Sequence, residues 1–85
     1  MPYIAKTDRE RLNPLIEVLS HQDIKSPGEL NYLLTMITHK FLNQQPENYQ
    51  SYNDAIGALE SAKLELYRRH VAEYEQEKIK LNGDV

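Results

Sequence analysis

Apolar side chains recur at spacings of three and four residues through most of the chain, which places them on one face of an α-helix. The clearest run contains Leu30, Leu33, Leu34, Ile37 and Phe41. No stretch alternates apolar and polar residues with β-branched enrichment, so no strand is predicted. The pattern predicts an all-α fold: a small three-helix bundle with a long C-terminal helix.

Capping residues set the predicted ends of the first two helices. Thr7-Asp8-Arg9-Glu10 has the spacing of a capping box, and a helix is predicted over about residues 8–21. Asn13-Pro14 favours a break within that stretch, with one kinked helix as the alternative. Ser26-Pro27-Gly28-Glu29 forms a second capping box, which predicts a helix over about residues 27–43.

The last third of the chain predicts one long helix over about residues 48–82. Good helix formers dominate it, and Gly57 is its only glycine. Asn82-Gly83 is a strong stop signal because glycine tolerates left-handed backbone angles. Such a helix is about 50 Å long, more than the other two helices can cover. Its length favours a scaffold or an interaction surface over a closed catalytic pocket.

Two apolar rows with coiled-coil spacing run along the predicted long helix. The rows, each with one lysine in a gap, are Tyr52, Ile56, Leu59, Lys63 and Leu66, and then Tyr67, Val71, Tyr74, Lys78 and Leu81. In a regular α-helix the second row is displaced by one residue, about 100° around the axis. Either the other helices cover both rows as a broad core, or the second half meets another chain, with a homodimer as one form of that contact.

Length and composition restrict the class of protein. The chain has 85 residues, enough for one small domain over residues 1–85, and it has no cysteine for disulfides or thiolate metal sites. No apolar run resembles a signal peptide or reaches the length of a membrane span, so we expect a cytoplasmic protein without a membrane partner. The net charge of −3 argues against nucleic acid as the main partner.

Residues that could carry catalysis or bind metal do not form a recognisable motif. His21, His39 and His70 lack the Glu-x-x-His spacing of a helical di-metal site, so no metal ligand is predicted. The chain has no glycine-rich phosphate loop, and no serine, threonine or lysine has an activating base near it in sequence. The sequence therefore predicts neither a catalytic residue nor a cofactor, and it does not favour an enzyme.

Arg68-Arg69-His70 is the only basic cluster of the chain. Glu65 lies four residues before Arg69, a spacing that predicts an ion pair along the helix. Tyr67 and Tyr74 offer aromatic faces beside the arginines. These four residues, Tyr67, Arg68, Arg69 and Tyr74, are the predicted contact surface for a protein partner or for a second copy of the chain.

A second hypothesis places a small-ligand or enzymatic site at Glu29, Asn31 and Tyr32 together with Arg68 and Arg69. It requires these side chains to converge in one concave site. A structural role for Asn31 competes with it, because a polar side chain beside an apolar row usually satisfies a backbone group elsewhere. A third hypothesis, regulation of a nucleic-acid process, rests on the arginines alone.

Several short motifs carry a resemblance. They are Met1-Pro2-Tyr3-Ile4, Gly28-Glu29-Leu30-Asn31-Tyr32, Tyr67-Arg68-Arg69, Tyr74-Glu75 and Asn82-Gly83-Asp84-Val85. Together they resemble a family of small uncharacterised proteins of bacteria and their phages, over nearly the whole chain. The resemblance implies a prokaryotic or phage cytoplasmic setting, and it implies that these motifs form one structural or binding unit. It brings no activity, substrate or catalytic residue.

Overall fold

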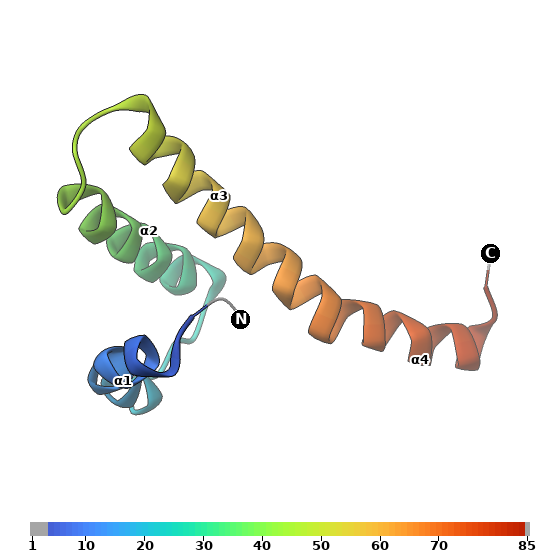
Figure 1. Ribbon diagram of the computed structural model, residues 1–85. Coiled ribbons are helices and arrows are strands. Elements are labelled where there is room, and N and C mark those ends of the chain that lie inside the picture. The colour runs from blue at the N-terminus through green and yellow to red at the C-terminus, as the bar shows by residue number, and fades with distance from the viewer. Residues whose placement is uncertain (1–3, 85) are drawn as a thin grey trace. The chain divides into compact units, whose positions relative to one another are not determined.

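The computed structural model describes residues 4–84, which form three helices, the last of them long (Figure 1). The elements are α1 (Lys6–Ser20), α2 (Pro27–Asn43), α3 (Tyr49–Leu66), a π-helical turn η1 (Tyr67–Val71) and α4 (Ala72–Asn82), where α3, η1 and α4 follow one another without a break. No strand occurs within the described range. The predicted all-α class with a long C-terminal helix is confirmed. Met1, Pro2, Tyr3 and Val85 of the quoted motifs lie outside the described residues.

The chain divides into two compact units, Met1–Ile37 and Thr38–Val85. The first unit contains α1 and the larger part of α2. The second contains the end of α2, the connecting loop and the whole of α3, η1 and α4. The single domain predicted for residues 1–85 stays a prediction.

α1 is one helix that runs through Pro14. The predicted break near Asn13 is therefore wrong. The alternative, one kinked helix, is confirmed as a single helix, and its kink stays a prediction. Proline has a backbone φ angle compatible with a helix, although it removes the N–H···O bond to the carbonyl four residues earlier and its ring crowds that carbonyl. The helix also begins before Thr7: Ala5 is the N-cap, without a side-chain bond, and the Arg9 N–H donates to the Ala5 carbonyl at 3.0 Å. The predicted Thr7 cap is wrong because Thr7 is already inside the helix.

The start of α2 agrees with its predicted capping residues. The Glu29 N–H donates to the Ser26 hydroxyl at 3.2 Å, which confirms Ser26 as the cap. The Glu29 carboxylate accepts from the N–H of Lys25 at 3.0 Å, one residue further back than in a standard capping box. Together the two bonds satisfy two backbone donors at the N-terminus of the helix.

The long helix begins and ends at identifiable caps. Asn48 is the N-cap of α3, and its side-chain oxygen accepts from the Ser51 N–H at 2.9 Å. At the other end the Gly83 N–H donates to the Ile79 carbonyl at 2.8 Å. Gly83 has φ +81° and ψ 158°, a backbone region that is essentially restricted to glycine. The predicted stop at Asn82-Gly83 is confirmed.

Candidate functional site

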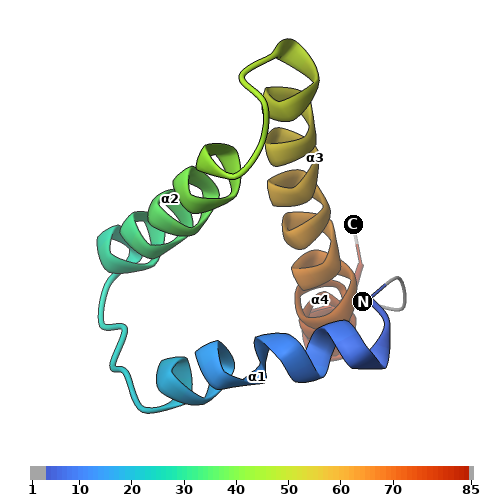
Figure 2. The ribbon, with the colours of Figure 1, turned by 60° about the vertical axis from the view of Figure 1, so that its left-hand side comes forward.

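The backbone of the long helix contains a π-turn where the two predicted apolar rows meet. The Ala72 N–H donates to the carbonyl of Tyr67, five residues earlier, where an α-helix would use the residue four earlier. Figures 1 and 2 show that the helix axis changes direction between α3 and α4. Sharp bends in helices often occur at such π-bulges, and π-bulges are frequent at functional sites.

The π-turn changes how the two rows are related. It holds one residue more than an α-helical turn, so everything after it is set back by about one residue, or about 100°. The five residues from Leu66 to Val71 therefore turn the chain around the helix axis by about as much as four residues do in a regular α-helix. The predicted displacement of 100° between the rows is wrong because it assumed a uniform α-helix. The rows instead form one continuous stripe, here called the seam: Tyr52, Ile56, Leu59, Lys63, Leu66, Val71, Tyr74, Lys78 and Leu81.

A hydrogen bond across the turn supports this alignment independently. The hydroxyl of Tyr67 donates to the Glu75 carboxylate, with oxygen distances of 3.1 and 3.2 Å. Residues eight apart in a regular α-helix lie about 80° apart around the axis. Tyr67 and Glu75 nevertheless share one side of the helix, because the π-turn makes eight residues equivalent to one heptad of seven. The bond raises the pKa of Tyr67, first through the hydrogen bond itself and then through the charge of Glu75.

The large apolar side chains of the seam are mostly exposed. The exposed fractions are 65% for Ile56, 56% for Leu66, 62% for Tyr74 and 76% for Leu81. A single helix cannot bury its own stripe, so the seam needs a covering surface from elsewhere and is a candidate binding surface.

Both seam lysines have neighbours on their own helix. The Lys63 ammonium lies 3.0 Å from the Glu60 carboxylate. The Lys78 ammonium lies 5.4 Å from the centre of the Tyr74 ring, within the range of a cation–π contact. The seam therefore combines apolar side chains with two positive charges and carries a carboxylate at its edge.

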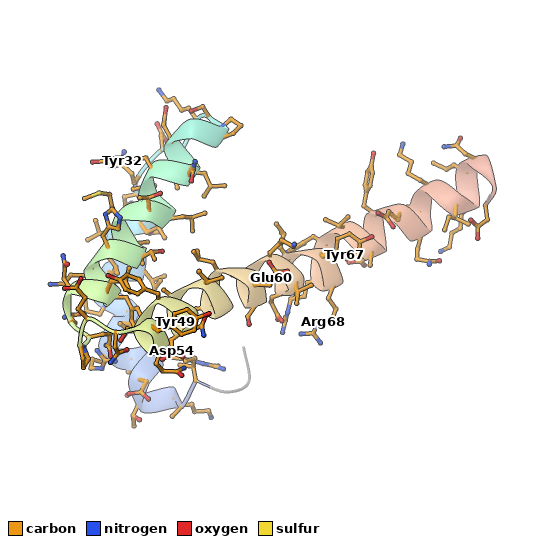
Figure 3. The ribbon with its side chains drawn as sticks, turned by 90° about the horizontal axis from the view of Figure 1, so that it is seen from above. Tyr32, Tyr49, Asp54, Glu60, Tyr67 and Arg68 are labelled. Carbon is orange, nitrogen blue, oxygen red and sulfur yellow. The ribbon has the colours of Figure 1, made fainter. Side chains whose placement is uncertain are left out.

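The predicted basic cluster is an ion-pair network around Glu65. Arg69 donates from Nε to this carboxylate, which confirms the predicted pair, and Arg68 donates from Nη2 at 2.7 Å. The two hydrogen bonds, to Arg68 first and then to Arg69, lower the pKa of Glu65 from 4.5 to about 2. Arg68 extends away from the helix (Figure 3). The arginines lie on the flank of the helix, whereas Tyr74 belongs to the seam.

The residues of the ligand-site hypothesis divide between the two units. Glu29 and Tyr32 line the same hollow of about 250 Å³ in the first unit, but Asn31 does not border it. The Asn31 carbonyl accepts from the Thr35 hydroxyl at 2.8 Å. Arg68 and Arg69 belong to the second unit. Convergence of all five residues stays a prediction.

A hollow that the sequence did not predict lies at the loop before α3. Its volume is about 480 Å³, and its lining includes His39, Glu47, Ser51 and Tyr52. Ser51 is buried, and its hydroxyl donates to the Pro46 carbonyl at 2.7 Å. The predicted helices over residues 27–43 and 48–82 leave a short connection here, but spacing alone does not show that His39, before the loop, and Tyr52, after it, line one hollow. With its hydroxyl committed to the loop, Ser51 has a structural role.

Within residues 4–84 the histidines do not cluster with several other side chains of metal-binding type. No group of three or more potential metal-binding side chains occurs in that range. His21 lies 3.1 Å from the Glu17 carboxylate, one helical turn earlier. No helix in the described range has both the length and the hydropathy of a membrane span.

Fold and surface together define a small all-α protein with a long helix whose apolar seam is exposed. The whole chain, residues 1–85, matches the model of a family described as a domain of unknown function, DUF6899. The chain belongs to this family. No curated protein and no solved structure matches it.

Proposed function

We propose that this protein is a non-enzymatic interaction or scaffold module that binds a protein partner through the second half of its long helix. The exposed surface from the π-turn onward carries the proposal: Tyr67 is 49%, Tyr74 62% and Leu81 76% exposed. Large aromatic and apolar side chains beside arginines are the composition found at the centres of protein interfaces. The cytoplasmic, bacterial or phage setting that the sequence motifs imply is part of this proposal.

The electrostatics of the flank favour a protein over a nucleic acid. The two arginines share the single carboxylate of Glu65, so the cluster keeps about one net positive charge, which is little for a phosphate backbone. A partner carboxylate, in contrast, can join an existing Arg–Glu network without displacing it. The alternative hypothesis, regulation of a nucleic-acid process, can be tested directly by an electrophoretic mobility shift assay at low salt. If the protein shifts no nucleic acid under these conditions, the hypothesis is wrong.

Ligand binding at Glu29 and Tyr32 has one supporting observation, the hollow that both residues line. Its size is below the range of about 300–1,000 Å³ that is typical of small-molecule sites. We therefore place it second to the interaction role. Chemical-shift changes confined to residues around this hollow on addition of small metabolites would reverse the order.

Photocrosslinking in the native host tests the interaction role. A photoreactive amino acid at position 74 should give a discrete crosslinked protein band. The same amino acid at position 9, on α1, serves as the matched control. A lower yield at position 74 in the Arg68→Ala/Arg69→Ala double variant would show that the arginines belong to the same contact. Equal crosslinking from both positions, or none from position 74, would contradict the proposal.

A further inference from the structure

Because of the π-turn, the long helix has one uninterrupted apolar stripe with heptad spacing. A regular α-helix with this sequence would have two displaced rows. Upstream of the turn the steps are four, three, four and three residues, from Tyr52 to Leu66. Downstream they are three, four and three, from Val71 to Leu81. Heptad stripes of this kind are the seams by which helices pair along their length.

We propose that the seam is occupied by the seam of a second copy of this chain. The inference rests on the proposed interaction role and names the partner. Two such helices would pair lengthwise across the π-turn and bury the apolar side chains of both copies. Arg68 and Arg69 would stay on the flank, available to a further partner.

The exposed area agrees with what a stable dimer needs. The exposed fractions of the six large apolar seam residues correspond to roughly 700 Å² per copy, taking about 200 Å² for each complete side chain. A specific interface of standard size buries about 800 Å² per partner. The apolar side chains of one seam therefore account for most of such an interface, and the flanking side chains would supply the rest.

The charges of the seam are self-complementary. Lys63 and Lys78 occupy seam positions, and Glu60, Glu75 and Glu77 border it. A two-fold dimer brings the same surface to itself, so each copy offers carboxylates at the edge to lysines within the facing seam. Lysines at such positions restrict the register of pairing. A second copy supplies both the apolar surface and the opposite charges.

Leu66 and Leu64 form a matched pair for the test. Both are 56% exposed and both lie in α3, but Leu66 belongs to the seam and Leu64, about 200° around the axis from it, does not. Sedimentation of the full chain at roughly 1–100 µM should show a dimer, since interfaces of this size start at micromolar affinity. Leu66→Glu should weaken the dimer about tenfold or more, because a charged carboxylate would replace an apolar side chain that pairing buries. Leu64→Glu should leave dimerisation unchanged.

If circular dichroism shows that Leu66→Glu loses its helical structure, variants that delete or insert one residue in the π-turn provide a second test. Deletion of His70 removes one residue from the π-turn, so an ordinary α-helix would keep the seam continuous and the dimer should persist. Insertion of one alanine after His70 adds a further displacement of about 100° and should abolish the dimer. Equal loss in both variants would overturn the alignment of the seam.

The outcomes separate this inference from the proposed function. A monomer at every concentration, or equal loss for the Leu64 and Leu66 variants, overturns self-association. If the purified chain is monomeric while position 74 crosslinks a different protein in the host, the interaction role stands and the second copy is excluded. If the chain is dimeric through the seam and position 74 crosslinks only another copy, the second copy is the partner.

Discussion

Tyr67 and Glu75 are hydrogen-bonded across the π-turn, although eight residues separate them. The bond shows that the helix face before the turn and the face after it coincide. A one-residue irregularity thus determines which side chains of the long helix form a common surface.

Replacing Glu75 with glutamine should lower the pKa of Tyr67 toward its ordinary value, because the carboxylate that raises it is removed. Glu73→Gln is the control, since Glu73 lies in the same helix without a bond to Tyr67. The raised pKa means that this bond contributes stability below about pH 10, which is lost as pH rises through the pKa of the folded state. Absorbance or NMR titration of the tyrosines measures the shift. An identical titration in both variants would contradict the assigned bond.

Glu65 should titrate near pH 2, well below its ordinary pKa of 4.5, because Arg68 and Arg69 stabilise its charged form. The depressed pKa contributes stability at neutral pH, and this is lost as pH falls from about 4.5 through about 2. Carbon-detected NMR of the carboxyl groups measures the pKa of Glu65 directly. Arg68→Gln and Arg69→Gln should each raise the pKa of Glu65, whereas Lys63→Gln should not, because Lys63 pairs with Glu60.

Ser26→Ala should destabilise α2 by about 1 kcal/mol, since it removes the acceptor for the Glu29 N–H. Thr7→Ala should change the free energy of unfolding by less than about 0.5 kcal/mol, because Thr7 does not cap α1. Thermal or urea unfolding followed by circular dichroism measures both. A larger loss for Thr7→Ala than for Ser26→Ala would contradict the observed helix starts.

Gly57→Ala should stabilise α3 by about 0.5–1 kcal/mol, because alanine has the higher helix propensity. An added Cβ at Gly57 meets no atom within 4 Å, so no clash offsets the gain. Gly83→Ala should act in the opposite direction, because its φ of +81° strains any residue with a side chain. Unfolding experiments on both variants should therefore give shifts of opposite sign.

The helix boundaries show where local signals suffice and where they conflict. Ser26-Pro27 and Asn82-Gly83 were predicted correctly, because caps and stops depend on a few adjacent residues. Thr7 and Asn13-Pro14 misled the prediction of α1. A capping spacing does not fix where a helix begins if residues before it can also be helical. A proline costs one hydrogen bond and some crowding in the preceding turn, which does not have to end a helix that continues on both sides.

The sequence by itself determined the all-α class, the long C-terminal helix, the Glu65–Arg69 pair and the two apolar rows, because each depends on residues within a few turns of one another. It also located the discontinuity between the rows at Leu66 and Tyr67. Only the three-dimensional structure decided what happens there. Whether five residues close a π-turn or continue as α-helix depends on a small difference in backbone hydrogen bonding, which helix propensity does not encode. That difference joins two separate rows into one seam.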